Sequence, residues 1–239
     1  MLSLHLLFEV LGYLAGLLVY VTLRKRSGDV ISTADRATVF TGAALGAALG
    51  SRLLFVLSYA GGNFFGGKSI VGGLLGGLIG VEIAKKVAGI TRSTGDLFVY
   101  PLITAMSIGR IGCFLAGPAD KTAGLPVSWG IAMGDNVPRH PVALYEIAFL
   151  AILAVALRAV RRDGDRFRFF LGSYLAFRFA VDFLKPDPPR YLLGLSAIQW
   201  ACAAGVLYYC LVLSNAGPNA SLPFLRRRRV DLHDVLPQG

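Results

Sequence analysis

Seven apolar runs, each about as long as a membrane-crossing helix, occupy most of this sequence. They are Leu2–Leu23, Ala37–Ala60, Ser69–Ile90, Leu97–Ala116, Val142–Leu157, Phe167–Leu184 and Leu195–Ser214. A helix of roughly 20 apolar residues crosses the hydrocarbon core of a bilayer and satisfies its own backbone hydrogen bonds there. The pattern predicts an all-α, polytopic membrane protein with seven transmembrane helices. A mean hydropathy of +0.62 with only 16% charged residues is unlike that of a soluble domain.

Basic residues are distributed unevenly between alternate loops. Sixteen Lys and Arg residues follow the first, third, fifth and seventh runs, whereas five lie in the opposite loops. Because cytoplasmic loops carry the excess of Lys and Arg, we expect the N-terminus outside and the C-terminus in the cytoplasm. Residues 1–214 would form one transmembrane domain with an external loop at 117–139, and residues 215–239 a basic cytoplasmic tail. The net charge of +10 then reports topology, and no nucleic-acid partner is expected.

Three arginines lie inside the apolar runs: Arg52 in the second, Arg110 in the fourth and Arg178 in the sixth. A charged side chain at mid-bilayer costs at least about 2.5 kcal/mol, so such residues are rare and usually functional. Guanidinium stays charged and presents a rigid fork of donors that suits phosphate. We infer a site for an anionic membrane component, and a phospholipid headgroup fits best. For Arg52 the alternative is structural pairing with Glu82 or another acid.

Other polar residues are expected at the outer level of Arg110 and Arg178. Tyr174, Arg178 and Asp182 recur every four residues and therefore share one helix face. Asp182 either orients the Arg178 guanidinium or only neutralises it. In the first run, His5 and Glu9 lie one turn apart, which suits either a base and its orienting acid or a helix-packing pair.

The fifth run begins after the external loop with a second polar group. Arg139 and His140 precede a proline at the expected helix start, and Tyr145 and Glu146 follow within it. His140 is interpreted either as a site residue or as a surface residue. The loop itself can cap the site or contact a protein substrate at the membrane surface.

Small residues recur at four-residue spacing in two neighbouring runs. They are Gly42, Gly46 and Gly50 in the second run and Gly72, Gly76 and Gly80 in the third. Glycine on one face lets transmembrane helices approach closely. The denser pair Gly72-Gly73 can alternatively present backbone N–H groups to a ligand oxyanion. The cysteines, Cys113, Cys202 and Cys210, follow no metal or redox spacing.

Three segments carry a family resemblance. Gly109–Phe114 (GRIGCF) resembles Gly-Arg-x-Gly-Asn-Phe, and Arg139–Glu146 (RHPVALYE) resembles Arg-His-Pro-x-x-Leu-Tyr-Glu. The segment that starts at Tyr174 is similar to Tyr-x-x-Phe-Arg-Phe-x-x-Glu-Phe-x-Arg-x-Pro-Asp. These are signatures of the bacterial phosphatidylglycerol–prolipoprotein diacylglyceryl transferases, and the resemblance covers the second to seventh runs in consistent order.

The resemblance implies transfer of a diacylglyceryl group from phosphatidylglycerol to the lipobox cysteine of a prolipoprotein, with release of glycerol phosphate. The reaction would take place at the outer side of the bacterial cytoplasmic (inner) membrane. Arg110 and Arg178 match essential arginines that would hold the phosphate and stabilise the leaving group, and Tyr174 matches a functional tyrosine. No metal and no organic cofactor is implied. The expected partners are phosphatidylglycerol, a signal peptide with its lipobox cysteine and membrane lipid, and the protein is expected to be a monomer.

The remaining candidates for substrate contact come from several runs and from the end of the external loop. They are Arg52, Gly72, Gly73, Cys113, Arg139, Tyr145, Glu146 and Asp182.

Among the departures from the family pattern, two concern the acceptor side. Val71 stands where the family has an essential histidine, and Cys113 replaces the asparagine of the arginine signature. We hypothesise that His5, supported by Glu9, or else His140, replaces the missing base. The departures leave three alternatives: a transferase acting on another acceptor, a non-catalytic protein that binds phospholipid or lipoprotein precursors, and a transporter. The odd number of runs and the lack of an inverted repeat in the hydropathy count against a transporter.

Overall fold

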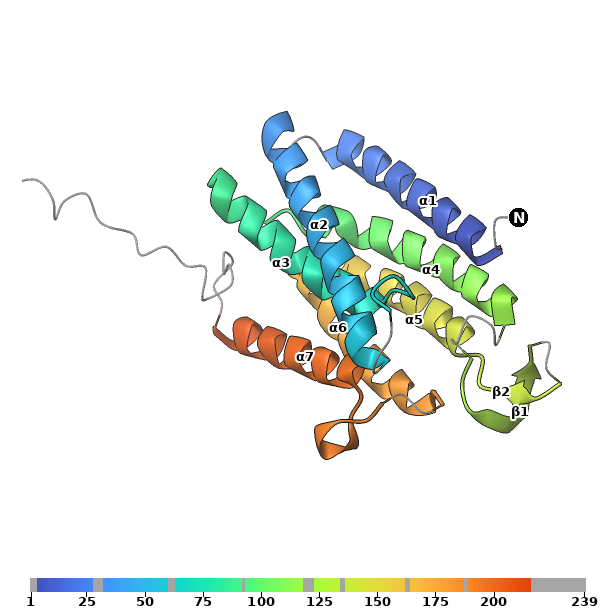
Figure 1. Ribbon diagram of the computed structural model, residues 1–239. Coiled ribbons are helices and arrows are strands. Elements are labelled where there is room, and N and C mark those ends of the chain that lie inside the picture. The colour runs from blue at the N-terminus through green and yellow to red at the C-terminus, as the bar shows by residue number, and fades with distance from the viewer. Residues whose placement is uncertain are drawn as a thin grey trace, which may run out of the picture.

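The predicted apolar runs form α-helices in the computed structural model, which describes residues 4–27, 32–59, 63–91, 93–117, 123–133, 136–161, 164–186 and 189–215 (Figure 1). The helices are α1 (Leu4–Ser27), α2 (Thr33–Ser58), α3 (Ile70–Ala88), α4 (Val99–Ala116), α5 (Val142–Ala156), α6 (Asp165–Val181) and α7 (Ala197–Asn215). Short 3-10 segments are η1 (Asp96–Phe98), η3 (Leu157–Ala159), η4 (Asp182–Leu184) and η5 (Leu192–Gly194). The predicted cytoplasmic tail lies, from residue 216 onward, outside the described residues.

Four stretches among the described residues are long and apolar enough to cross a membrane by themselves. They are Leu4–Arg26, Thr33–Ser58, Asp96–Ala116 and Val142–Ala159. The charged residues of α3 and α6 interrupt their apolar character, and α7 contributes a shorter apolar stretch, Ala197–Leu211. The helical membrane class predicted from the sequence is therefore supported, while the count of seven crossings stays a prediction.

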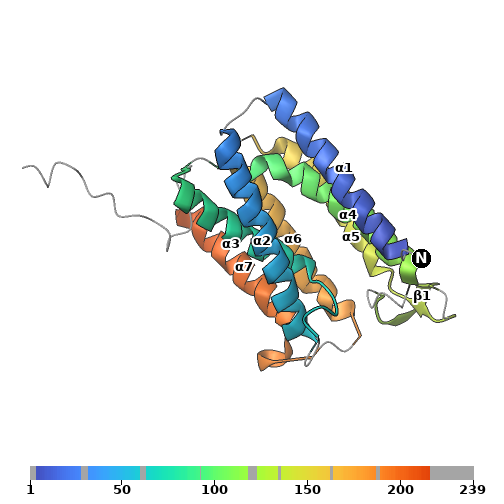
Figure 2. The same ribbon diagram turned by 45° about the horizontal axis from the view of Figure 1, so that its top comes forward.

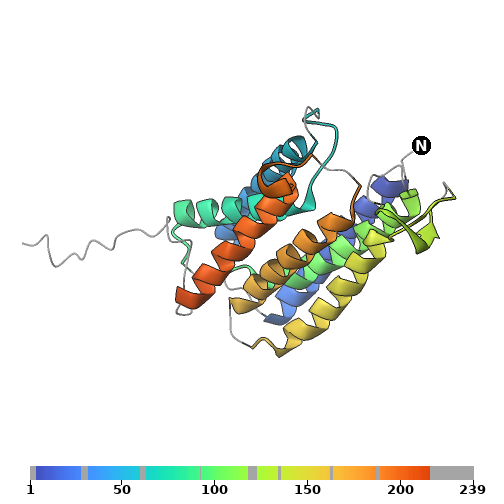
Figure 3. The ribbon, with the colours of Figure 1, turned by 90° about the horizontal axis from the view of Figure 1, so that it is seen from below.

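The helices form two groups that α6 joins. In Figures 2 and 3, α1, α4 and α5 lie side by side, and α2, α3 and α7 lie together on the other side. The most extensive helix pairs are α2 with α3 and α1 with α4, and α6 contacts both α5 and α7. Residues on α4, α5 and α6 are thereby brought together at one end of the molecule.

The closest helix contact is made by the predicted glycine stripe. A Cβ atom on Gly46 would lie 2.2 Å from the carbonyl oxygen of Gly76, and one on Gly76 would lie 2.2 Å from that of Gly46. The opposed pairs to either side, Gly42 with Gly80 and Gly50 with Gly72, are equally tight. The packing interpretation of the stripe is therefore confirmed, because nothing larger than glycine fits between these backbones.

The loop that is predicted to be external contains a small antiparallel sheet that the all-α prediction did not include. Strands β1 (Pro126–Ala132) and β2 (Pro138–Arg139) pair with each other (Figure 1). The backbone N–H of Leu125 donates to the carbonyl of Leu184 at 2.7 Å, and that of His140 donates to the carbonyl of Leu125 at 3.1 Å. The first of these bonds attaches the loop to η4, directly after α6, and the second closes the base of the hairpin.

Candidate active site

Five ionisable side chains are buried together where α4, α5 and α6 meet. Arg110 comes from α4, Glu146 from α5, Tyr174 and Arg178 from α6, and Asp182 from η4. All five are at least nine-tenths buried. Charged side chains are rarely this deeply buried unless they are paired. The cluster is therefore either a structural ion-pair network or a binding site. It is called the arginine cluster below.

Glu146 is the central acceptor of the arginine cluster. Its Oε1 lies 2.9 Å from Nε of Arg110 and accepts a hydrogen bond from the Tyr174 hydroxyl at 2.8 Å. The charge of Arg178 also acts on Glu146. Glu146 was predicted as a substrate contact, whereas in the structure it is the partner of Arg110. The burial of Arg110 depends on this partner, because an unpaired buried charge is strongly destabilising.

Asp182 is held from the other side by the start of α7. Its Oδ1 lies 3.6 Å from Nη2 of Arg178, and its Oδ2 accepts a hydrogen bond from the Ser196 hydroxyl. Ser196 and Gln199 form a capping box: the Ser196 N–H donates to Oε1 of Gln199 at 2.9 Å, and the Gln199 N–H donates to Oγ of Ser196 at 3.1 Å. The Ser-x-x-Gln spacing before an apolar run was the sequence signal for this arrangement.

Several buried atoms of the cluster have no hydrogen-bond partner among the described residues. They include Nη1 of Arg178, Oε2 of Glu146 and Oδ1 of Asp182. Leaving such a group unsatisfied costs about 1–3 kcal/mol, and more when it is charged. At 3.6 Å from Nη2, Asp182 does not satisfy all the hydrogen-bond donors of the Arg178 guanidinium. Nη1 of Arg178 is left to donate to an oxyanion.

Lys185 follows η4 and adds a third cation beside the cluster. Burial, together with the positive charges of Arg178 and Arg110, lowers the pKa of Lys185 from 10.5 to about 7. In the unfolded chain Lys185 stays protonated up to its ordinary pKa of 10.5, whereas in the folded protein it releases its proton near pH 7. Its contribution to the free energy of unfolding therefore increases as pH rises from 7 toward 10.5.

His5 and Cys113 extend the cluster toward α1. The Sγ atom of Cys113 lies 3.7 Å from Nη1 of Arg110 and 3.9 Å from Nδ1 of His5. Glu9, the expected partner of His5, accepts a hydrogen bond from Tyr13 at 2.8 Å and is ion-paired with Lys68. The structure thus brings His5 near Arg110, and it adds Lys68 to the surroundings of Glu9.

His140 lies in a separate aromatic group beneath the hairpin. Its Nδ1 is 3.2 Å from the Tyr145 hydroxyl, and the Trp129 ring meets its imidazole edge-to-face at 4.9 Å between centroids. Arg139 lies beside it in β2. These three predicted site residues, His140, Tyr145 and Arg139, are therefore grouped together at the hairpin.

The other predicted contacts, Arg52, Gly72 and Gly73, lie in α2 and in the first turn of α3. Arg52 donates to the carbonyl of Gly67 at 2.8 Å, whereas Glu82 pairs with Lys85, so the suggested pairing of Arg52 with Glu82 is wrong. The N–H groups of Gly72 and Gly73 donate to Oγ and to the carbonyl of Ser69 in the first turn of α3. Their amides are thus engaged within the helix.

Comparison with known proteins agrees with the segments described above. A family model described as "Prolipoprotein diacylglyceryl transferase" matches residues 3–214. Similar proteins named "Phosphatidylglycerol--prolipoprotein diacylglyceryl transferase" include one from Geobacter sulfurreducens, 32% identical over 211 residues with 80% of each chain covered. One from Bordetella bronchiseptica is 33% identical with 87% of each chain covered. One from Nitratidesulfovibrio vulgaris is 35% identical with 75% of this chain and 72% of its own covered.

Proposed function

Because this chain belongs to the prolipoprotein diacylglyceryl transferase family, we propose that it transfers a diacylglyceryl group from phosphatidylglycerol to the lipobox cysteine of a prolipoprotein. Both substrates are those named for its relatives. The observation that supports placing the reaction at the arginine cluster is the buried guanidinium of Arg178, whose Nη1 has no hydrogen-bond partner among the described residues. A phosphate oxygen is the acceptor that such a donor fits.

The proposed reaction has a simple balance. The thiol sulfur forms a bond to the glyceryl carbon that carries the phosphate, and the carbon–oxygen bond breaks. The electron pair leaves on the oxygen of glycerol phosphate, and the thiol proton passes to a base. Arg110 and Arg178 hold the phosphate and stabilise the charge that develops on it. Tyr174 and Glu146 keep Arg110 in place, since Glu146 contacts both residues.

We assign the role of base to His5. Val71, which occupies the position of the family's histidine, is 1% exposed and packs in the apolar core, so its own position offers no base. His5 reaches Cys113, which in turn contacts Arg110, whereas His140 is grouped with Trp129 and Tyr145. Among the two histidines, His5 is therefore the one connected to an arginine of the cluster.

A transfer assay tests the function and the base together. With labelled phosphatidylglycerol and a lipobox peptide, the protein should release glycerol phosphate and leave a thioether on the peptide cysteine. His5→Ala should lower the rate by about 10²–10⁴-fold, the usual contribution of a general base, while His140→Ala should lower it much less. Full activity in both single variants and in the double variant would exclude a histidine base. Absence of transfer in the unaltered protein would contradict the proposed function.

The alternative acceptor is favoured by the two departures from the family pattern. Val71 is a core residue, and Cys113 places a thiol where the family has an amide. Mass spectrometry of membranes containing the protein separates the two cases. Glycerol phosphate release together with a diacylglyceryl adduct on a molecule other than the lipobox peptide would identify a different acceptor.

Lys185 is expected to make phosphatidylglycerol binding dependent on pH. With a pKa of about 7 the amine is half protonated at neutral pH, and only the protonated form attracts phosphate. The KM for phosphatidylglycerol should rise about tenfold between pH 6 and pH 9 as one charge-assisted hydrogen bond is lost. Lys185→Arg, which supplies the residue of the family pattern at this position, should keep KM constant over the same range. An equal rise in both proteins would exclude Lys185 from phosphate binding.

The proposed topology follows the charge distribution. The protein would cross the bacterial cytoplasmic membrane seven times as a monomer, with the N-terminus and the arginine cluster toward the outer side. Lys85 and Lys86 at the end of α3 and Arg158 in η3 support this, since all lie at the helix ends opposite the hairpin. Residues 1–214 would form the transmembrane domain. Cysteine accessibility at positions near these basic residues, measured with a membrane-impermeant reagent, tests the orientation.

A further inference from the structure

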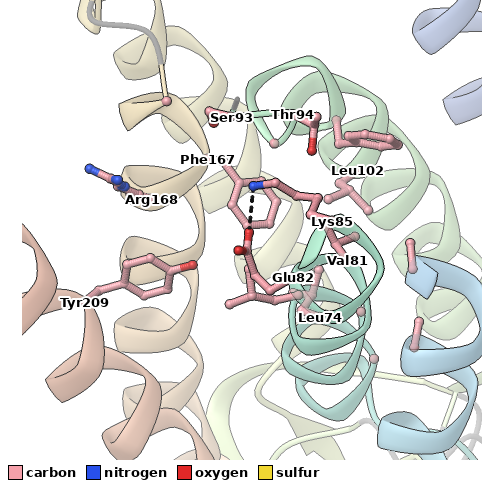
Figure 4. A pocket seen from close by; sticks show the side chains of 18 of the residues that line it. Leu74, Val81, Glu82, Lys85, Ser93, Thr94, Leu102, Phe167, Arg168 and Tyr209 are labelled. Atoms are coloured by element: carbon pink, nitrogen blue, oxygen red, sulfur yellow. Dashed lines mark hydrogen bonds and ion pairs between the residues drawn. The ribbon is translucent and has the colours of Figure 1, made fainter. Parts of the chain in front are cut away.

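A cavity of about 220 Å³ lies between α2, α3, α4, α6 and α7, away from the arginine cluster (Figure 4). It is lined on α6 by Phe167 and Arg168 and on α4 by Leu102. Arg178 follows ten residues after Arg168, which is about 15 Å along a helix, and Arg110 follows Leu102 by about 12 Å. On these two helices the cavity lining is thus about two to three turns farther toward the proposed cytoplasmic side than the two arginines.

One end of the cavity is polar. Lys85 Nζ lies 3.1 Å from Oε1 of Glu82, and the two side chains are only 10% and 15% exposed. Figure 4 shows the Tyr209 hydroxyl pointing from α7 toward this pair, with Thr94 above it. Arg168 lies at the edge of the same region and pairs with Asp165 at 3.1 Å. Both signs of charge are therefore present at this end.

The other end is apolar and is kept open by small residues. Gly73 and Gly77 of α3 face Ala43 and Ala47 of α2 along the cavity wall. A Cβ atom on Gly77 would meet nothing closer than 3.5 Å, in contrast to the 2.2 Å at Gly76. Helix packing therefore requires glycine at Gly76 but not at Gly77. Leucine side chains nearby make this end unsuited to water, which needs several polar partners.

We propose that this cavity binds a phospholipid in the orientation of the cytoplasmic leaflet, with its headgroup at Glu82 and Lys85 and an acyl chain along Gly77. The polar end of the cavity lies toward the proposed cytoplasmic side and the apolar end away from it. A lipid held by its headgroup at Arg110 and Arg178 would have the opposite orientation. The chains of such a lipid would bring apolar groups against the Glu82–Lys85 pair. The inference rests on the topology given under Proposed function.

The headgroup that fits best is zwitterionic. Lys85 offers a cation to a phosphate, while Glu82 offers a carboxylate to an ammonium group. A purely anionic headgroup would instead place its charge against Glu82. The ligand class is therefore an aminophospholipid such as phosphatidylethanolamine, distinct from the anionic phosphatidylglycerol of the transfer reaction.

Native mass spectrometry of the purified full chain in detergent, titrated with phosphatidylethanolamine or phosphatidylglycerol, tests this. Gly77→Leu fills the apolar end and should weaken phosphatidylethanolamine binding at least tenfold, with Gly77→Ala giving a smaller loss in the same direction. Glu82→Gln should reduce the preference for phosphatidylethanolamine over phosphatidylglycerol. Ala44→Leu, the matched control on the exposed face of α2, should bind as the unaltered protein does.

The transfer assay distinguishes the possible sources of lipid. The inference predicts that Gly77→Leu keeps its rate and its KM for phosphatidylglycerol. A raised KM with unchanged phosphatidylethanolamine binding would show that the cavity holds acyl chains of the substrate and would overturn the proposal. Unchanged binding of both lipids by Gly77→Leu and Gly77→Ala would likewise overturn it. Loss of transfer in the unaltered protein would contradict the proposed function while leaving the lipid-binding result to be judged separately.

Discussion

Arg178→Gln is expected to lower diacylglyceryl transfer by on the order of 10²–10³-fold. Removing one preorganised donor from a developing oxyanion has an effect of that size, and Nη1 of Arg178 is a buried guanidinium nitrogen without a hydrogen-bond partner among the described residues. Arg178→Lys should lose less, because it keeps the charge but not the bidentate fork. The measurement is release of labelled glycerol phosphate in the presence of a lipobox peptide. Arg158→Gln, the same change at an exposed arginine, should leave the rate unchanged.

The double variant Arg178→Gln with Asp182→Asn separates two roles of Arg178. If the arginine only neutralises Asp182, which lies 3.6 Å away, removing both charges should restore transfer. If it binds phosphate, the double variant should be as inactive as Arg178→Gln. Restored transfer would therefore contradict the assignment, and thermal unfolding of each variant in detergent shows whether the fold has been kept.

Glu146→Ala is expected to destabilise the fold by about 3–5 kcal/mol, the usual cost of leaving a buried charge without its partner. Glu146 is 1% exposed and lies 2.9 Å from Nε of Arg110, so the substitution leaves a buried guanidinium without its carboxylate partner. Transfer should fall with it, because Arg110 loses the group that orients it. The measurement is the free energy of unfolding in mixed micelles.

Two companion variants identify the cause. Tyr174→Phe removes a single hydrogen bond to Glu146 and should cost only about 0.5–1.5 kcal/mol. Adding Arg110→Met to Glu146→Ala removes the orphaned charge and should recover part of the stability, although not the activity. Equal destabilisation in Tyr174→Phe and Glu146→Ala would contradict the importance of the ion pair.

Contacts within one helix were the predictable part of the site. The four-residue spacing of Tyr174, Arg178 and Asp182 placed them on one face, and all three are buried in the arginine cluster. The spacing of His5 and Glu9 predicted that the two act on each other, which they do electrostatically, but it did not predict the contacts with Cys113 and Lys68. Neighbours along a helix are determined by its period, whereas their partners depend on which helix lies opposite.

By itself the sequence determined the membrane class, the helical segments and the family, because hydropathy, length and short motifs are local properties of the chain. Only the tertiary structure decided that Arg110 pairs with Glu146, that His5 approaches Cys113 across 108 residues, and that the loop with the hairpin bonds to η4. Those contacts depend on the depth and rotation of packed helices. Close backbone contacts such as that between Gly46 and Gly76 determine this depth and this rotation, and they form only when the helices assemble.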